Sequence, residues 1–358
     1  MTTPCISIIM AVYNGEKYLR ESMDSVFEQD FQDYEFIIID DCSTDNSSKI
    51  IHEYKDKRIK YFKNSTNIGQ TKSLNRGLRK SCGRYIARID ADDLFLTRKL
   101  TKQYKYMELN PGVSACGTAS KKIDESGNKI GLRLPPTTNH EICSAMLYRS
   151  AMIHVSILIR SKSIKSLGGY DEKYPICADY DLWCRMIINN MKLANLPEVL
   201  TCHRQYIGSL GSRTYLDKSV LELTEIMSNY WSKFLNHEIP KSELMEISLI
   251  RWPKSDLTPD KMCRAFENIT DARRLADVDW HYFDSVSVDT YKLLLWGLRE
   301  RNQYRRTNKQ EVHYLRIYYN LIKDYVRKPS IIIIIVIALL SELIPVKFIH
   351  YMKKYFSS

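Results

Sequence analysis

The sequence shows few signs of an exported, disulfide-bonded protein. Its nine cysteines are an odd number without a Cys-x-x-Cys pair, and its first residues lack the basic, apolar, small-residue order of a signal peptide. Disulfide frameworks belong to oxidising compartments, and a free cysteine behaves as a small hydrophobic side chain. We therefore expect a chain of the reducing cytosol, in which most of the cysteines are buried.

Long apolar runs are also scarce. The run 331–340 ends at Ser341 after ten residues, whereas a helix that crosses a bilayer needs about twenty. A full membrane span is therefore the weaker interpretation of this segment. The chain contains no internal repeat and no low-complexity linker. It also has no Gly-rich N-terminal loop followed by a basic residue that could hold a triphosphate, which argues against a nucleotidyltransferase.

Length and composition suit a globular protein of one large domain with an appendage, or of two modest domains, since 44% of the 358 residues are hydrophobic. The pattern becomes largely helical after about residue 212. We therefore expect a first domain at 1–212, a helical extension at 213–328 and an apolar and basic tail at 329–358. The formal net charge is +11, and residues 301–328, with eight basic and two acidic side chains, supply about half of it.

The basic block 301–328 limits the choice of partners. One face of its expected helix carries Leu315, Tyr318 and Ile322 with Arg and Lys around them, which is typical of a helix lying on an anionic membrane surface. A helix packed on its own domain or on a partner protein would show the same pattern. Nucleic acid is a poorer explanation, because the block is joined to an apolar tail.

The first 90 residues or so alternate between strands and helices in the order β-α-β-α-β. Nearly continuous apolar runs such as CISIIMAV are typical of parallel strands covered on both faces, and apolar residues at helical spacing follow them. A helix that stops at Gly83, a strand that ends at Ile89 and a further helix over 94–108 come next. The pattern predicts an α/β fold with a mostly parallel sheet flanked by helices.

Carboxylates follow two of these strands. Asp40 and Asp41 end the strand YEFIII, and the turn DADD at 90–93 ends the strand YIARI. In an open parallel sheet, ligands bind outside the carboxyl ends of the strands, so we expect both clusters to border one crevice. Three carboxylates on one turn repel one another unless a divalent cation such as Mg²⁺ or Mn²⁺ lies among them. Helix capping is the alternative explanation for such aspartates.

An aromatic side chain ends the first strand. Tyr13 lies beside Asn14 and Gly15 and offers a ring face on which a base could stack, although a core aromatic is the alternative. A tyrosine and a carboxylate at adjacent strand ends, with a metal-competent turn one strand further on, together predict a nucleotide site that extends from base to phosphate.

Three blocks of sequence carry a resemblance to a known family: ISIIMAVYNGEKYLRESMDSVFEQDFQDYEFIIIDDCSTDNS, NIGQTKSLNRGLRKSCGRYIARIDADD and GGYDEKYPICADYDLWCRM. Over about residues 6–212 the chain resembles the family-2 glycosyltransferases with the GT-A fold. The resemblance implies a Rossmann-like sheet and an inverting transferase for a hexosyl or N-acetylhexosaminyl group. It also implies a nucleotide-sugar donor, commonly UDP-linked, and a requirement for Mg²⁺ or Mn²⁺.

The resemblance assigns several residues to the donor site. Tyr13 and Asp40 match the positions that hold the base, and Asp41 lies beside them. Asn67 and Gly69 match an Asn-x-Gly turn that precedes the helix supporting the donor pocket.

It also implies roles close to the reacting atoms. Asp92 matches the metal ligand of the Asp-x-Asp signature, and Asp90 matches the residue that faces the ribose and the sugar. Asp179 matches the catalytic base, although Asp181 is close enough to be a rival and helix capping would explain either. His154 matches a histidine that is frequent before the strand VSILIRS, and a packed core histidine is the alternative.

The chain departs from the family pattern at two positions. Ala178 replaces the Glu that usually precedes the base, and Tyr206 replaces a histidine that many relatives carry two positions after the arginine. These departures affect acceptor geometry and metal affinity, and they leave Asp92 and Asp179 in place. Ala178 is also the one feature that favours an alternative function, a non-catalytic sugar-nucleotide-binding partner in a membrane-associated assembly.

The sequence therefore predicts a cytoplasmic glycosyltransferase, peripheral on the inner face of the cell membrane, that binds no nucleic acid. Its expected acceptor is a hydroxyl group in polysaccharide or lipid-linked glycan biosynthesis, because a lipid-linked acceptor accounts for both the basic block and the apolar tail.

Overall fold

A computed structural model describes residues 3–206, 216–236 and 238–250, and the structural statements below refer to these residues. By its contacts the chain divides into two units, Met1–Leu295 and Trp296–Ser358, and every described residue belongs to the first. The expected basic block 301–328 and the tail 329–358 lie outside the described residues. Within the described part, no helix has the length and apolar character needed to cross a bilayer.

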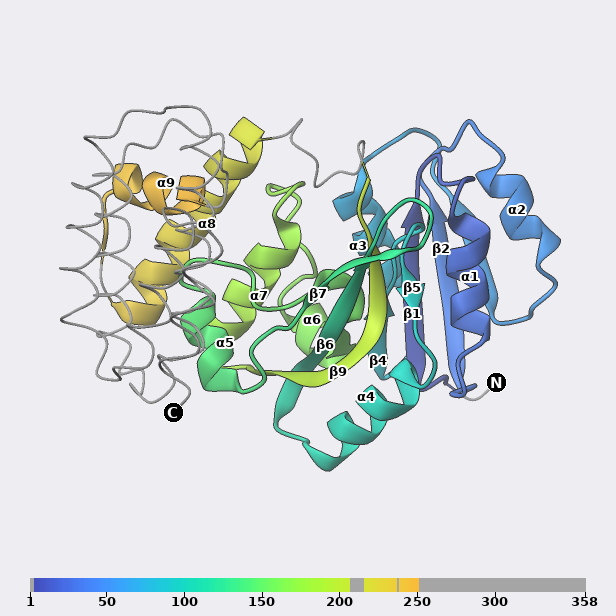
Figure 1. The fold of residues 1–358 in the computed structure, drawn as a ribbon, viewed down its shortest axis with the longest axis horizontal. Helices are drawn as coiled ribbons and strands as arrows, with labels where there is room; N and C mark the ends of the chain where they lie inside the picture. The colour runs from blue at the N-terminus through green and yellow to red at the C-terminus, as the bar shows by residue number, and fades with distance from the viewer. Residues whose placement is uncertain (1–2, 207–215, 237, 251–358) are drawn as a thin grey trace, which may run out of the picture. The chain divides into compact units, whose positions relative to one another are not determined.

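Four parallel strands form the N-terminal half of the sheet, in the spatial order β3-β2-β1-β4 (Figure 1). These strands are β1 (Ile6–Val12), β2 (Tyr34–Asp40), β3 (Ile59–Lys63) and β4 (Tyr85–Arg88). Val12 pairs with Asp40, and Ile9 pairs with Arg88. The carboxyl ends of β1, β2 and β4 therefore lie side by side, which brings both acidic clusters to one edge.

The second half of the sheet is mixed. The order continues from β4 through β8, β6 and β9 to β5, and β7 pairs with β6. These strands are β5 (Leu94–Phe95), β6 (Val113–Ile123), β7 (Lys129–Arg133), β8 (Leu158–Arg160) and β9 (Lys192–Arg204). The long strand β9 runs parallel to β6 and ends beside the acidic turn after β4, as described below. The predicted α/β fold is confirmed.

Helices flank the sheet. They are α1 (Leu19–Phe27), α2 (Ser47–Glu53), α3 (Gln70–Lys80), α4 (Lys99–Leu109), α5 (Asn139–Ala145), α6 (Ser161–Ser166) and α7 (Ala178–Ile188), with a 3-10 turn η1 (His154–Ser156). Helix α3 packs closely on β1 at Gly77. A Cβ added to this glycine would lie only 2.5 Å from Ile9 Cγ2. Such a close approach needs a glycine.

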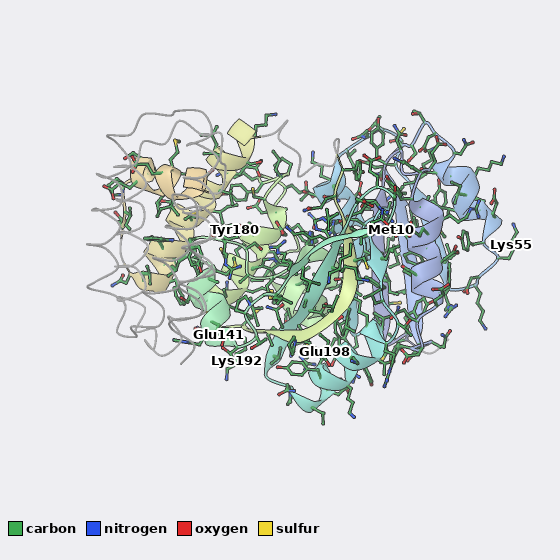
Figure 2. The ribbon with its side chains drawn as sticks, in the orientation of Figure 1. Met10, Lys55, Glu141, Tyr180, Lys192 and Glu198 are labelled. Carbon is green, nitrogen blue, oxygen red and sulfur yellow. The ribbon has the colours of Figure 1, made fainter. Side chains whose placement is uncertain are left out.

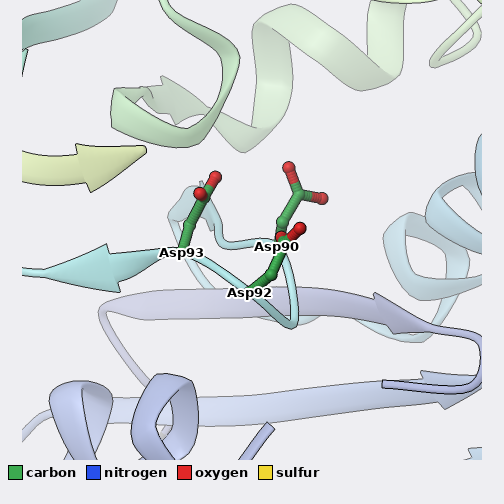
Figure 3. Close-up of side chains that lie close together, drawn as sticks. All are labelled: Asp90, Asp92 and Asp93. Carbon is green, nitrogen blue, oxygen red and sulfur yellow. The ribbon is translucent and has the colours of Figure 1, made fainter. Parts of the chain in front are cut away.

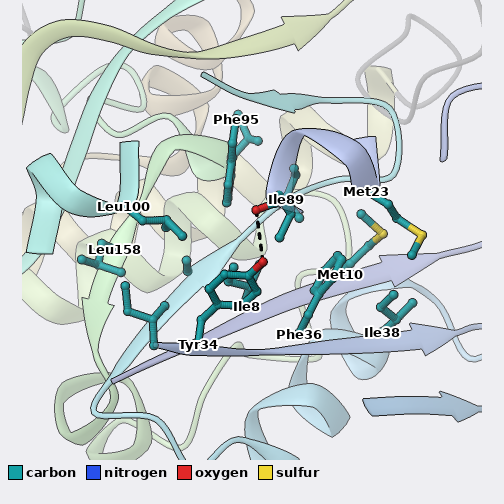
Figure 4. Packing of buried hydrophobic residues seen from close by; sticks show 14 of the residues in the cluster. Ile8, Met10, Met23, Tyr34, Phe36, Ile38, Ile89, Phe95, Leu100 and Leu158 are labelled. Carbon is teal, nitrogen blue, oxygen red and sulfur yellow. Dashed lines mark hydrogen bonds between the residues drawn. The ribbon is translucent and has the colours of Figure 1, made fainter. Parts of the chain in front are cut away.

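The core lies between the sheet and these helices. Ile8, Met10 and Phe36 have no exposed surface, and they pack with residues of α1 such as Met23 (Figure 4). The hydroxyl of the buried Tyr34 donates a hydrogen bond to the Val26 carbonyl over 3.3 Å, which satisfies the one polar atom of that ring. Figure 2 shows the separation of apolar and polar side chains over the whole domain, with the labelled Met10 inside and polar side chains such as Lys55 outside.

The first helix beyond residue 212 packs against the sheet domain, and the second packs on the first. Helix α8 (Leu216–Leu235) contacts α7 and α9 (Lys241–Ile250). The Tyr230 hydroxyl donates to the Cys143 carbonyl over 3.1 Å, and Trp231 Nε1 donates to the Leu147 carbonyl over 2.9 Å. Both aromatic rings are fully buried. The start of the predicted helical extension is therefore joined to the sheet domain through a shared core.

Two local predictions were wrong. The helix expected from residue 94 begins at Lys99, because Leu94 and Phe95 form a short strand that pairs with β9. Gly83 does not end α3, which stops at Lys80. A Cβ on Gly83 would lie 2.5 Å from the Ser7 nitrogen, so this glycine serves a close approach between backbones instead. Both errors arise from contacts with distant segments.

Candidate active site

Three carboxylates meet on the turn that follows β4. The ligand oxygens of Asp90, Asp92 and Asp93 all lie within 4.8 Å of one another (Figure 3). Burial raises the pKa of Asp92 to about 6, and the charge of Asp90 adds to this effect. Burial also raises the pKa of Asp93 well above its usual value. At neutral pH this turn therefore favours bound protons or a cation, and its oxygen ligands suit Mg²⁺ or Mn²⁺.

Arg88, the last residue of β4, is a buried cation beside this turn. Its side chain is 4% exposed, and it donates a hydrogen bond to Asp90 Oδ1. Burial disfavours its charge, yet the pKa of the guanidinium is raised by four neighbouring acidic groups: Asp90, Tyr170, Asp93 and Asp179. Its Nε atom is buried and has no hydrogen-bond partner in the described part of the chain. Arg88 thus lies within the electrostatic reach of both the acidic turn and α7.

The candidate base lies in the first turn of α7. Asp179 is partly exposed, and its charge acts on Arg88. Its rival Asp181 is 6% exposed and accepts a hydrogen bond of 2.7 Å from Arg185 Nε in an ion pair. Asp181 is therefore engaged in holding α7, which makes it the weaker candidate for a role in chemistry, and the role of Asp179 stays a prediction.

Helix α8 supports the start of α7. Glu222 Oε2 accepts hydrogen bonds from the backbone nitrogens of Ile176, over 3.1 Å, and Cys177, over 2.9 Å. These two residues directly precede the helix that carries Asp179. A carboxylate at this end satisfies backbone N–H groups that have no partner within the helix. The segment beyond residue 212 therefore helps to position the candidate base.

Asp40, which is predicted to contact the base of the nucleotide, is fully buried at the end of β2. Its carboxylate accepts hydrogen bonds of 2.7 Å from the Ser43 nitrogen and the Tyr61 hydroxyl, and Lys63 Nζ lies 3.6 Å away. These contacts hold the loop that follows β2. Direct contact between Asp40 and the base of a nucleotide would require this loop to move. The predicted role of Asp40 in binding the nucleotide therefore stays a prediction.

Asp41 is also buried, but it faces the turn that leads into α3. Its oxygens accept hydrogen bonds from the backbone nitrogens of Ile68, over 2.9 Å, and Gly69, over 2.8 Å, and from Asn64 Nδ2 over 2.6 Å. Gly69 has a φ of 88°, which a side chain would disfavour. Asp41 therefore determines the shape of the predicted Asn67–Gly69 turn.

This turn connects the two acidic clusters. Asn67 is exposed, and its side-chain oxygen accepts a hydrogen bond from the Gly69 nitrogen over 3.2 Å. The next residue, Gln70, donates from Nε2 to Asp90 Oδ1 over 3.0 Å. A chain of hydrogen bonds therefore runs from Asp41 through the turn to the carboxylates after β4.

Tyr13 is 52% exposed, so its ring face is available to a ligand. The backbone beside it is held in place: Asn14, with a φ of 50°, accepts a hydrogen bond of 2.9 Å on its side-chain oxygen from the Thr44 nitrogen. A packed core position, the alternative for Tyr13, is excluded by this exposure. An exposed aromatic on a fixed loop is suited to stacking against a base.

Arg204, at the end of β9, anchors the acidic turn from the other side. Its backbone nitrogen donates to Asp93 Oδ1 over 2.8 Å, and its Nε donates to the Asp92 carbonyl over 3.0 Å. Two residues later, the Tyr206 hydroxyl hydrogen-bonds with the Asp92 side chain. This hydrogen bond offsets part of the rise in the pKa of Asp92 that burial causes. Tyr206, the departure from the family pattern, therefore occupies the edge of the candidate metal site.

His154 packs against aromatic side chains of neighbouring segments. Its Nε2 lies 2.8 Å from the Tyr170 hydroxyl, and its ring contacts Trp183 edge-on. Burial, with the nearby charge of Arg88, lowers the pKa of His154 well below its usual value. A neutral histidine within the core agrees with the alternative considered for this residue.

The acidic turn brings Asp90 and Asp92 together beside Arg88, whose charge also interacts with that of Asp179, and Asp41 and Tyr13 lie at the adjacent strand ends. Sequence reasoning missed Arg88 and Arg204 as members of the site. A signal for Arg88 was present, because an arginine inside an otherwise apolar strand requires a buried counter-ion.

Comparisons with known proteins identify the family of the chain. The sequence profile described as Glycosyl transferase family 2 matches residues 7–166. An uncharacterized glycosyltransferase of Methanocaldococcus jannaschii is 38% identical over 209 residues, which are 57% of this chain and 72% of that protein. The chain belongs to glycosyl transferase family 2. As a member of this family it is a glycosyltransferase that uses a nucleotide-sugar donor.

Solved structures show the same fold. TarS 1-349 of S. aureus, in complex with UDP-GlcNAc, matches this glycosyltransferase with a TM-score of 0.57 and 18% identity, over 84% of this chain and 91% of that one. The mannosyltransferase PcManGT from Pyrobaculum calidifontis, in complex with GDP-Man and Mn²⁺, matches with a TM-score of 0.52 and 15% identity, over 84% and 85% of the two chains. The predicted GT-A fold is confirmed.

Proposed function

We propose that this family 2 glycosyltransferase moves a sugar from a UDP-sugar to a hydroxyl acceptor with inversion, and that it requires Mg²⁺ or Mn²⁺. The observation that carries the proposal is the cluster of Asp90, Asp92 and Asp93 beside the buried Arg88, whose charge also interacts with that of Asp179. A carboxylate cluster for a metal and a separate, accessible carboxylate are what an inverting transfer needs.

Asp92 would hold the metal ion, and Asp90 would face the ribose and the sugar. The residues fit such an ion, because the three carboxylates offer only oxygen ligands and the buried Asp93 Oδ2 has no hydrogen-bond partner among the described residues. When bound, the metal supplies positive charge that stabilises the leaving diphosphate. Tyr13 would stack on the base, while Asp40, Asp41, Asn67 and Gly69 shape the donor loops.

Asp179 would accept the proton from the acceptor hydroxyl. Its partial exposure lets an acceptor reach it, and Asp181 is already occupied by Arg185. A base that acts on the side opposite the leaving group produces inversion in a single displacement. Ala178 removes the second carboxylate usual at this place, and the charge of Arg88 interacts with that of Asp179.

The donor nucleotide is proposed as UDP, and GDP is the competing choice. TarS was solved with UDP-GlcNAc, whereas PcManGT was solved with GDP-Man, so the shared fold accommodates both. The acceptor is proposed as a growing polysaccharide or a lipid-linked glycan at the inner face of the cell membrane. The basic segment 301–328 motivates this proposal.

The decisive experiment is a hydrolysis assay with a panel of UDP- and GDP-sugars, with Mn²⁺, with Mg²⁺ and with EDTA. Slow release of UDP from one sugar, abolished by EDTA, is expected, because water can replace the acceptor. The alternative is a non-catalytic sugar-nucleotide-binding partner, favoured by Ala178. That protein would bind UDP in calorimetry and release none from any UDP- or GDP-sugar, and this result would overturn the proposed function.

A further inference from the structure

The hairpin formed by β6 and β7 carries a row of exposed aliphatic side chains. Ile130, Leu132 and Leu134 are 54%, 46% and 61% exposed. Leu132 and Leu134 are alternate residues and point to the same side, and Ile130 lies beside them at the irregularity in the β6–β7 register, so we call the three the aliphatic row. They are three of the seven large hydrophobic side chains most exposed in the described residues, and the other four are dispersed. This concentration within residues 130–134 distinguishes the hairpin from ordinary surface.

The charges of the hairpin are unevenly compensated. Its two acidic residues are both engaged, since Asp124 accepts hydrogen bonds from the Ser126 and Asn128 nitrogens within the turn and Glu125 pairs with Lys17 at 2.6 Å. The basic residues are more numerous, and they are Lys121, Lys122, Lys129 and Arg133. Lys121 pairs with Leu132 across the hairpin and therefore shares the face of the aliphatic row. The row is bordered by positive charge.

The side chain of Arg204 connects the hairpin with the candidate metal site. Arg204 Nη1 donates hydrogen bonds to the carbonyls of Asp124, over 3.1 Å, and Glu125, over 3.3 Å. Nε of the same guanidinium donates to the Asp92 carbonyl over 3.0 Å. The turn of the hairpin and the acidic turn are therefore held by one arginine, so a surface bound by the hairpin would lie close to the reacting atoms.

We propose that the β6–β7 hairpin binds an anionic lipid surface and so brings a lipid-linked acceptor to the site beside Asp92. This inference rests on the proposed function for its acceptor class. Aliphatic side chains next to lysines are suited to the boundary between acyl chains and negatively charged head groups. Unlike the block 301–328, this contact belongs to the catalytic domain itself.

Two other occupants fit the surface less well. A second copy of the chain could pair along the outer edge of β7, which has no strand partner in the described residues. Such pairing would place Lys129 and Arg133 of one β7 against β7 of the other copy, and basic side chains on an edge strand oppose it. A protein partner would more typically meet aromatic side chains at the centre of the patch, and this row has none.

Hydrogen exchange of the full chain tests the proposal. The probe is a vesicle of phosphatidylglycerol and phosphatidylcholine, and a vesicle of phosphatidylcholine alone is the comparison. We expect the amides of residues 129–134 to exchange about tenfold more slowly with the anionic vesicle, and to be unaffected by the neutral one. Vesicle flotation of the triple variant Ile130→Ser, Leu132→Ser, Leu134→Ser should show a partition coefficient at least about tenfold lower.

The matched controls are Leu109→Ser and Leu221→Ser, which remove side chains that are 71% and 59% exposed elsewhere on the surface. Their partition coefficients should stay within about twofold of the parent, since these residues lie outside the basic row. Unchanged exchange at 129–134, or equal partition of the triple variant and the controls, overturns the proposal. Slow exchange without vesicles also overturns it: it indicates self-association if it depends on protein concentration, and cover by another segment of the chain if it does not.

Hydrolysis of a UDP-sugar separates this inference from the proposed function. The triple variant should hydrolyse the donor at the parent rate, because none of the three residues contacts the carboxylates of the site. Hydrolysis without lipid-dependent protection would leave the transferase intact and remove the hairpin from its role. Lipid-dependent protection without hydrolysis would instead remove the proposed function and, with it, the acceptor assigned to the hairpin.

Discussion

Arg88 donates a hydrogen bond to Asp90, and its guanidinium also lies in the electrostatic field of Asp179. One buried cation therefore connects the candidate metal turn with the candidate base. Within the ion pair with Asp90, the Arg88 side chain is almost completely shielded from water, since it is 4% exposed. Removal of Arg88 leaves the neighbouring carboxylates without a positive charge that compensates their own.

Arg88→Met should therefore lower kcat for donor hydrolysis by at least about 100-fold, because both Asp90 and Asp179 lose their positioning charge. Arg88→Lys should recover part of the loss, since it keeps the charge without the planar fork. The measurement is kcat and KM for each variant. A change confined to thermal stability, with kcat preserved, would show that Arg88 is only structural.

Asp179→Asn should retain UDP affinity within about twofold and lose at least about 100-fold in transfer, as expected for a missing general base. Calorimetry gives the affinity, and UDP release in the presence of acceptor gives the rate. Asp181→Asn is the control, and it should chiefly reduce stability because it breaks the ion pair with Arg185. Near-normal turnover of Asp179→Asn would exclude this residue as the base.

Asp92→Ala should weaken UDP binding in the presence of Mn²⁺ by at least about tenfold and leave the weak binding in EDTA unchanged. The expected reason is the loss of a metal ligand from a turn whose remaining carboxylates repel one another. Calorimetric titrations with Mn²⁺ and with EDTA measure the UDP affinity under the two conditions. Equal affinities for parent and variant in Mn²⁺ would remove Asp92 from the metal site.

Asp41→Ala should lower the free energy of unfolding by about 2–4 kcal/mol, because three buried donors lose their acceptor. Affinity for UDP should fall with it, since the Asn67–Gly69 turn loses its support. Urea unfolding and calorimetry provide the two measurements. The exposed Asp33→Ala would serve as the control for a general effect of lost charge. Unchanged stability of Asp41→Ala would contradict the assigned role.

The titration of Lys99 should make the free energy of unfolding depend on pH. The side chain is fully buried, its Nζ has no hydrogen-bond partner in the described residues, and it lies 4.0 Å from the centre of the Phe95 ring. Burial lowers the pKa of Lys99 to about 7. Between pH 7 and about 10 the unfolded chain retains a proton that the folded protein has released, so stability rises with pH in this window. Below pH 7 the folded protein bears the full cost of a buried charge.

Lys99→Met should therefore raise the free energy of unfolding by about 2–4 kcal/mol at pH 6.5, and the advantage over the parent should narrow by pH 9.5. Urea unfolding at the two pH values measures the difference. Lys102→Met, which removes a partly exposed lysine paired with Glu198, should change stability by less than about 1 kcal/mol at both. An advantage of Lys99→Met that does not vary with pH would contradict the expected titration.

Local pattern was sufficient for the first half of the sheet. Parallel strands buried on both faces produce continuous apolar runs, and the runs at β1, β2 and β4 were each followed by polar residues at the edge where ligands bind. Asp90, Asp92 and Tyr13 were therefore accessible to sequence reasoning. The long strand β9 was not recognised as a strand, because its residues do not alternate regularly and its partner β6 lies about 80 residues away in the register.

The individual roles of the acidic residues depended on long-range contacts. Asp40 and Asp41 are neighbours in the chain, yet one faces Tyr61 and the other faces Gly69. Asp179 and Asp181 share one helical turn, but only Asp181 has Arg185 one turn further along the helix with its guanidinium held by the Leu167 and Gly169 carbonyls. The resemblance of three sequence blocks therefore indicated the family, while composition and spacing indicated the fold class and the edge of the sheet that carries the carboxylates. The packing of distant segments decided which carboxylate is buried, paired or accessible, because hydrogen bonding and desolvation depend on neighbours that the local sequence does not contain.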